Sequence, residues 1–191
     1  MLNTYRLYPI VVLGLLAGAS IWLERVTRID EPVTSIEQTG PDFIANNTRV
    51  VGYGADGAQR YELLAERLSH FPQGDLTRLD MPQLRMTNEG RETRITARQG
   101  EVSPGGEQVD MQGDVRVRRP ASAGAPALAL DSDTLTVWPE SHRARTDSPV
   151  HMTRGATRAD AQGLRADNLF GTLELIGQVR VSMPRRQGPA S

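Results

Sequence analysis

The stretch Val109-Asp-Met-Gln-Gly-Asp-Val-Arg-Val117 decides the fold, because apolar and polar residues alternate along it around one central glycine. Alternation of this kind is typical of a β-strand with one buried and one wet face. The glycine fits a bulge or tight bend between two strands. The pattern returns in Leu173-Glu-Leu-Ile-Gly-Gln-Val-Arg-Val181, and a degraded copy runs from Ala144 to Met152 with Ser148 in the place of the glycine. The chain therefore contains an internal β repeat.

A second marker gives the length of this repeat. Four short segments with a small or apolar start and an apolar end close at Leu68, Val102, Leu135 and Leu169, which are 34, 33 and 34 residues apart. A fixed period of this size indicates that each unit is a small group of strands that stacks on the next. The predicted fold class is all-β, with stacked antiparallel strands from a roughly 34-residue repeat.

The segment from Tyr61 to Leu68 could be helical by composition, but it also alternates. The Asp56-Gly57 pair just before it favours a hairpin turn, because glycine adopts a positive φ without cost. The six residues Gly52-Tyr-Gly-Ala-Asp-Gly57 formally match a dinucleotide-binding motif, which needs a helix after it. Since strands are expected on both sides, the sequence favours a hairpin here.

The N-terminal segment from Leu7 to Leu23 contains no charged residue. As a helix it would span roughly 25 Å, close to the thickness of a bilayer core. A cleaved signal peptide is the alternative, because Ala17-Gly18-Ala19 resembles a cleavage site. The apolar run continues past that site to Leu23, which favours a transmembrane anchor. Gly14 and Gly18 form a G-x-x-x-G pair, either by chance or to let another membrane helix approach closely.

The predicted domains follow from these patterns: residues 1–23 a transmembrane anchor, 24–41 a linker, 42–183 the β domain, and 184–191 a flexible tail. Either interpretation of the N-terminus places the β domain outside the cytoplasm.

Composition and motifs argue against several function classes. A net charge of −1 and an aromatic content of 5% do not suit a general nucleic-acid binder. The absence of cysteine excludes thiol catalysis and cysteine-ligated zinc. His70, His142 and His151 have no metal-ligand spacing, and no serine lies in a nucleophile motif. We therefore expect no enzyme activity, no metal and no cofactor.

The candidate binding residues are the apolar side chains that alternate with polar ones along the strands, which we call the apolar or inner phase. It forms either an ordinary closed core or a groove for acyl chains, and alternation alone gives the same pattern for both. The candidate lipid-binding residues are Leu63, Leu84, Met86, Ile95, Val109, Met111, Val115, Val117, Leu135, Val137, Met152, Leu173, Leu175 and Val179.

The order and spacing of these features, more than any single motif, resemble a known family. An N-terminal anchor, a linker, Asp56-Gly57-x-x-x-Tyr61-x-Leu63-x-Ala65-x-x-Leu68-x-His70-Phe71 and then G-x-V-x-V repeats are similar to the LptC family of lipopolysaccharide export proteins. The resemblance covers essentially the whole chain. It implies an open β-jellyroll with a hydrophobic interior, held in the periplasm by a single-pass inner-membrane anchor.

The resemblance also implies partners. The domain would receive lipopolysaccharide from the inner-membrane ABC transporter LptB/LptF/LptG and pass it to the bridge protein LptA. The N-terminal edge, about Phe43 to Tyr53, would face the transporter, and the C-terminal edge, about Leu164 to Val181, would face LptA. The partner-binding residues implied are Gly14 and Gly18 in the anchor, the turn glycines Gly57 and Gly155, and Leu164 and Leu169 at the C-terminal edge.

Two other functions remain open from the sequence. One is a membrane-anchored structural β-scaffold with a closed core. The other is a soluble, LptA-like periplasmic bridge, which would require cleavage of the N-terminal segment after Ala19.

Overall fold

The computed structural model describes residues 16–20, 22–25, 40–54, 56–88, 90–122, 124–168 and 170–183. They belong to two units that divide between Glu37 and Gln38. In the first unit, residues 16–20 and 22–25 are helical and exposed. Within the described part of the chain, no helix is both long and apolar enough to cross a membrane. Gly14 and most of the predicted anchor and linker lie outside the described residues, as does the predicted tail.

The second unit consists of antiparallel strands, which confirms the all-β prediction and is consistent with a jellyroll. The strands are β1 (Phe43–Tyr53), β2 (Gln59–Phe71), β3 (Leu76–Asp80), β4 (Gln83–Asn88), β5 (Arg91–Thr96), β6 (Gln99–Val102), β7 (Val109–Arg119), β8 (Leu128–Trp138), β9 (Arg143–Thr146), β10 (Val150–Arg154), β11 (Thr157–Ala161), β12 (Gly163–Asp167), β13 (Thr172–Ile176) and β14 (Arg180–Ser182). A short 3-10 turn, Pro104–Gly106, joins β6 to β7.

The sheet has two parts, because three long strands, β2, β7 and β8, each pair with different neighbours along their two halves. Residues 61–64 of β2 pair with β4, whereas residues 67–71 pair with β3. In β7, residues 109–112 pair with β6 and residues 116–118 with β5. β8 pairs with β10 through its first half and with β9 through its second, and β1 follows β2 over the whole length.

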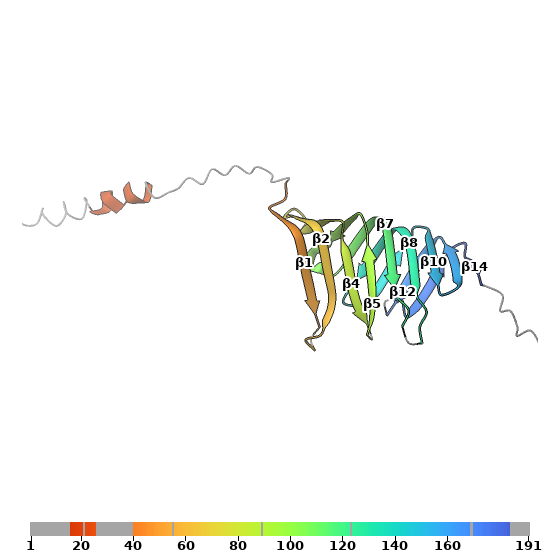
Figure 1. Ribbon diagram of the computed structural model, residues 1–191. Coiled ribbons are helices and arrows are strands. Elements are labelled where there is room, and N and C mark those ends of the chain that lie inside the picture. The colour runs from red at the N-terminus through yellow and green to blue at the C-terminus, as the bar shows by residue number, and fades with distance from the viewer. Residues whose placement is uncertain are drawn as a thin grey trace, which may run out of the picture. The chain divides into compact units, whose positions relative to one another are not determined.

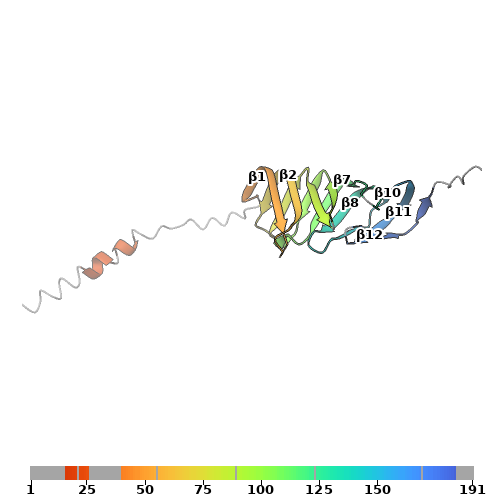
Figure 2. The same cartoon turned by 60° about the horizontal axis from the view of Figure 1, so that its bottom comes forward.

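We call the two parts leaf 1 and leaf 2. Leaf 1 contains β4, β5, β10, β11 and β14, and leaf 2 contains β3, β6, β9, β12 and β13; each also includes one half of β1, β2, β7 and β8. In Figure 1 the strands of leaf 1 follow one another from β1 to β14, and Figure 2 shows the same succession from a turned view. The chain always crosses from one leaf to the other at the same corner. The hairpin turns lie at the strand ends away from this corner, which we call the rims of the two leaves.

Positive φ angles mark this corner, as the central glycine of the repeat predicts. Gly113 (φ +75°) lies in β7 where the register shifts between Gln112 and Val115, and Gly177 (φ +87°) lies between β13 and β14. Glycine adopts such angles at no steric cost, which explains its place in each copy. The degraded copy also crosses here, with Ser148 between β9 and β10.

A further copy of the repeat escaped the sequence pattern. β3 and β4 cross the same corner at Met81, which adopts φ +50° although it is not glycine. The apolar residues Leu79, Leu84 and Met86 were the available signal, but the marker glycine is absent.

A row of inward side chains runs across the strands of each leaf. In leaf 1 the row is Val50, Leu63, Leu84, Ile95, Val117, Leu130, Met152, Ala159 and Val181, each the Cα partner of the next. In leaf 2 it begins Ala45, Leu68, Leu79, Gly100, Met111 and Leu135. The central members of both rows pack into a single hydrophobic core between the leaves.

Candidate functional site

The apolar interior is buried at the centre of the domain and exposed at both ends. Along the leaf 1 row, Leu84, Ile95, Val117 and Leu130 are 0% exposed. At the two ends of the same row, Val50 is 39% exposed and Val181 is 52% exposed. A closed globular core would cover its outermost strands, so the apolar interior runs through the domain and ends at two uncovered edges.

The structure brings the predicted lipid-binding residues together on this inner phase. Leu63, Leu84, Met86, Ile95, Val109, Met111, Val115, Val117, Leu135 and Val137 are buried in the core. Met152, Leu173 and Leu175 are half-buried against that core, toward the C-terminal end. Val179 precedes β14 and is exposed. Their shared environment agrees with one continuous apolar surface.

The N-terminal edge is β1, which pairs with β2 and with no other described strand. Its other side carries unpaired backbone N–H and C=O groups that can accept a further strand. Phe43 and Val50 face the same way as the core, and Phe43 is 56% exposed. The predicted N-terminal edge, about Phe43 to Tyr53, coincides with this strand.

The C-terminal edge is narrower than the sequence suggested. β12 pairs with both β9 and β13, so it is not an edge strand, and its Leu164 is fully buried. The edge strands are β13 in leaf 2 and β14 in leaf 1. Leu169 lies outside the described residues.

The predicted glycines occupy exposed positions. Gly57 (φ +74°) forms the β1–β2 turn, where Asp56 accepts a hydrogen bond from Ala58 N at 3.1 Å. This bond is the main cause that lowers the pKa of Asp56. Gly155 (φ +58°) forms the β10–β11 turn, and its N donates to Ala127 O at 2.9 Å. Gly18 belongs to the helical residues of the first unit.

The two rims of the leaves meet opposite the corner, and we call this line of contact the mouth. Asn88 at the end of β4 donates from Nδ2 to Asn168 O in the β12–β13 turn at 3.2 Å, and also to the Asn168 side chain. Arg119 at the end of β7 donates from Nη1 to Phe170 O of that turn at 3.5 Å. Phe170 is 1% exposed and adopts φ +72°, an unusual conformation for a bulky residue.

Arg119 is the buried charge of the mouth. The residue is 4% exposed, and burial lowers the pKa of its guanidinium, with further lowering by the positive charges of Arg91 and Arg154. The sequence analysis missed both the mouth contacts and the burial of Arg119. Alternation was the available signal, because Arg119 follows Val115 and Val117 on the same phase.

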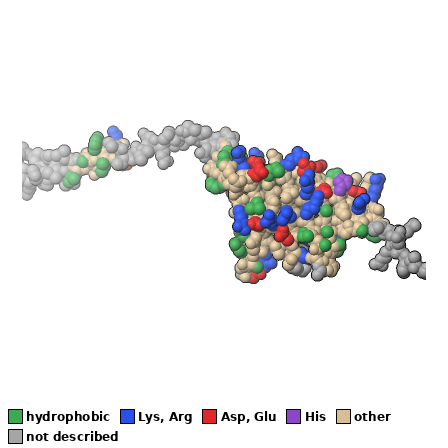
Figure 3. Space-filling model, in the orientation of Figure 1, with side chains coloured by type: hydrophobic (Ala, Val, Ile, Leu, Met, Phe, Trp, Pro, Cys, Tyr) green, Lys and Arg blue, Asp and Glu red, His purple; other side chains and the backbone are tan. Residues whose placement is uncertain are grey.

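The outer face of leaf 1 carries paired charges. Arg85, Arg94 and Arg118 lie directly opposite one another across β4, β5 and β7. Each has a carboxylate partner: Glu62 at 3.3 Å, Glu92 at 3.3 Å and Asp131 at 2.6 Å, respectively. Figure 3 shows arginines gathered on one face of the molecule with carboxylates among them. This face is a solvated surface with its charges largely compensated.

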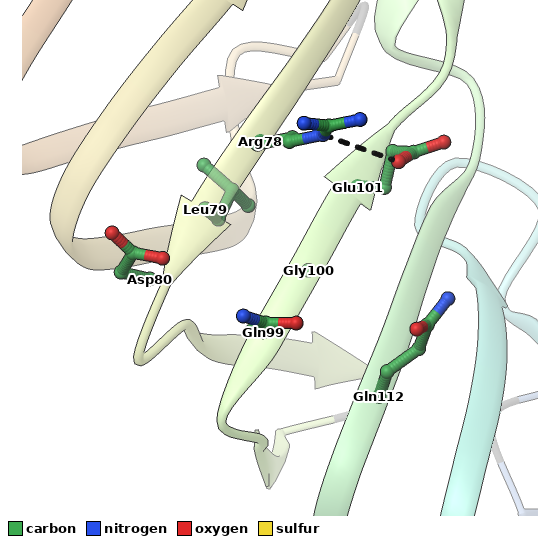
Figure 4. A pocket seen from close by; sticks show the side chains of 7 residues that line it. All are labelled: Arg78, Leu79, Asp80, Gln99, Gly100, Glu101 and Gln112. Atoms are coloured by element: carbon green, nitrogen blue, oxygen red, sulfur yellow. Dashed lines mark ion pairs between the residues drawn. The ribbon is translucent and has the colours of Figure 1, made fainter.

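A hollow on leaf 2 is polar rather than apolar. It has a volume of about 300 Å³ and is lined from β3, β6 and β7, with Gly100 at its centre (Figure 4). Arg78 and Glu101 form an ion pair across it, with 3.9 Å between Nε and Oε2. Such a lining does not suit acyl chains. In the described part of the chain, no three His, Asp or Glu side chains are grouped as a metal site.

Comparison with solved structures supports the fold. The chain is similar to the crystal structure of LptH, the LptA-homologous periplasmic component of the conserved lipopolysaccharide transport device of Pseudomonas aeruginosa. The TM-score is 0.54 at 7% sequence identity, with 65% of this chain and 95% of that chain covered. A comparison with curated protein sequences found no match.

The family comparison covers more of the sequence. The model of the lipopolysaccharide-assembly, LptC-related family matches residues 10–183. That range includes every described strand and the apolar rows between the leaves. The chain therefore belongs to the LptC-related family of lipopolysaccharide-assembly proteins.

Proposed function

We propose that this protein carries lipopolysaccharide from the inner membrane toward the outer membrane, with the acyl chains of the lipid held between the two leaves. The observation that carries the proposal is the leaf 1 row, which is apolar from β1 to β14 and exposed at both ends. Acyl chains gain free energy from burial in proportion to the apolar area that leaves water. The protein would act without catalysis.

The two edges of the domain supply the direction of transfer in this proposal. β1 would pair with a β domain of the ABC transporter LptB/LptF/LptG, and β13 and β14 would pair with LptA. Strand addition at an exposed edge joins two sheets by backbone hydrogen bonds. The inner rows of neighbouring domains would then form one apolar path, which matches the exposed ends at Val50 and Val181.

The N-terminal segment would hold the domain at the inner membrane. The uncharged run from Leu7 to Leu23 supports a single transmembrane helix with the β domain in the periplasm. Mass spectrometry of the purified mature protein tests this part. A mass that includes residues 1–23 supports the anchor, whereas a chain that begins at Ser20 would make the protein a soluble bridge.

Photocrosslinking in cells that depend on this protein tests lipid passage. A photoreactive residue at half-buried Met152 or Leu175 should form adducts with lipopolysaccharide, because both face the interior. The adjacent outward positions, His151 and Glu174, are matched controls and should form none. Adducts should depend on ATP hydrolysis by the transporter.

A second candidate function is a structural scaffold with a closed core. The complete burial of Leu84, Ile95, Val117 and Leu130 favours it, because these side chains already fill the centre of the interior. The same experiment separates the two functions. Adducts from neither Met152 nor Leu175, with the protein folded and in place, would favour the scaffold and contradict lipid passage.

A further inference from the structure

Three arginines continue the inward phase of leaf 1 at its rim. Arg119 follows Val115 and Val117 in β7, and Arg154 follows Val150 and Met152 in β10. Arg91 begins β5 on the same phase as Thr93 and Ile95. On each of these strands the inner face therefore changes from apolar to cationic at the mouth.

The strand register places these arginines near one another. Arg119 and Arg154 are both Cα partners of Leu128, so they lie on either side of β8 and about 10 Å apart by strand spacing. Arg91 lies on β5, which is the other neighbour of β7. It comes three residues before Arg94, and Arg94 is the Cα partner of Arg118. We call these three residues the mouth arginines.

The mouth arginines repel one another. Burial is the main cause that lowers the pKa of Arg119, and the charges of Arg91 and Arg154 lower it further. On the outer face, Arg85, Arg94 and Arg118 each have a carboxylate partner. Arg154 forms no ion pair with any residue that the structure describes. A bound anion would relieve this repulsion, because opposite charges stabilise a guanidinium in a partly desolvated site.

We propose that the mouth arginines bind the phosphate groups of the lipid cargo while its acyl chains occupy the apolar interior. This inference rests on the proposed lipid-carrier function and adds to it the part of the protein that holds the headgroup. It assigns the mouth, rather than the outer face of leaf 1, as the anionic subsite.

The geometry fits an amphiphile with a phosphorylated headgroup. Val117 comes two residues before Arg119 in β7, and Met152 comes two residues before Arg154 in β10. The apolar interior and the arginines at the rim therefore belong to the same strands. An extended strand advances about 6.7 Å over two residues, which is a short step from acyl chain to headgroup. Guanidinium groups bind phosphate oxygens through two parallel hydrogen bonds, which gives orientation as well as affinity.

The mouth turn also fits this assignment. Arg119 donates to Phe170 O, and the Phe170 residue is buried beside it. The β12–β13 turn therefore contributes a carbonyl and an apolar side chain where headgroup and acyl region would meet. Asn88 and Asn168 extend the polar side of the mouth.

The test compares bisphosphorylated lipid A with the same lipid after removal of both phosphates, bound to the purified full-length chain and measured by surface plasmon resonance. The main variant is Arg154→Gln, because Arg154 is exposed and its change should not affect folding. Arg158→Gln is the matched control, since Arg158 is an exposed arginine of the neighbouring strand β11 on the outward phase.

We expect the unchanged protein to prefer the bisphosphorylated lipid and Arg154→Gln to weaken its binding about tenfold, the loss of one charge-assisted hydrogen bond. Binding of the dephosphorylated lipid should be the same in both proteins. Arg158→Gln should bind both lipids as the unchanged protein does. Arg91→Gln combined with Arg154→Gln should remove most of the remaining preference.

Three results would overturn the inference in different ways. Equal phosphate preference in Arg154→Gln and Arg158→Gln would place the anionic subsite elsewhere and leave the lipid-carrier function standing. Displacement of the lipid by an excess of inorganic phosphate would assign the mouth arginines to the free anion. Failure of the unchanged protein to bind either lipid would contradict the proposed function itself.

Discussion

Gly113 is a single residue on which the crossing between the leaves depends. Its φ is +75°, and a Cβ there would lie 3.3 Å from Cβ of Arg98. We expect Gly113→Val to lower the free energy of unfolding by about 2 kcal/mol, because a β-branched residue is strained at positive φ and also crowds Arg98. Urea unfolding followed by circular dichroism measures this change. Gly113→Asn is the control and should lose less, since asparagine tolerates this conformation; equal stability of all three proteins would contradict the argument.

The residues that the sequence predicted differ in kind from those it missed. Gly113 and Gly177 were predictable because residue type and conformation agree there. Met81 was not, because nothing in a methionine indicates a positive φ. Arg119 could have been placed by continuing the alternation one step past Val117. Its contact with Phe170 could not, since that pairing joins residues 51 apart in the chain.

In the proposed function, partner binding depends on the edge strands. Val181 in β14 faces inward and is 52% exposed, while Ser182 beside it faces outward. We expect Val181→Lys to abolish co-purification of a neighbouring jellyroll domain, because a charge would enter the apolar path where two domains join. Ser182→Lys places the same charge on the outer phase and should retain the partner. Loss of the partner in both variants would mean that the pairing does not align the inner phases.

At the same scale, the strands were easier to predict than their neighbours. The alternation around Gly113 placed β7, and the run from Phe43 to Tyr53 became β1. The position of β12 between β9 and β13 was not predicted. Strand order is set by pairings between distant segments, which local alternation does not contain.

For the whole molecule, the internal repeat accounts for most of what could be predicted. Each period of about 34 residues crosses the corner twice, once into each leaf, and so produces two facing leaves with an apolar interior. The repeat does not predict the mouth, because the two sides of the mouth come from different turns. In the proposed function, the mouth would determine whether a lipid can enter from the side or only through the two edges.

If the headgroup remains outside while the acyl chains are held between the leaves, the mouth must open when lipid binds. Asn88 and Asn168 are in contact across the mouth, and the chain has no native cysteine to compete with an introduced pair. In Asn88→Cys/Asn168→Cys, a disulfide or a short bismaleimide bridge should abolish lipopolysaccharide adducts from position 152, and a reductant should restore them in the disulfide form. Thr87→Cys/Glu92→Cys is the matched control, because these residues pair within leaf 1 and their bridge leaves the mouth free.

The bridged proteins then distinguish two routes for the lipid. Loss of adducts only when the mouth is bridged would mean that the leaves separate at their rims to admit the headgroup. Unchanged adducts with a fully bridged mouth would contradict lateral entry. The lipid would then enter through the edges at β1 and at β13 and β14, where Val50 and Val181 leave the apolar interior exposed.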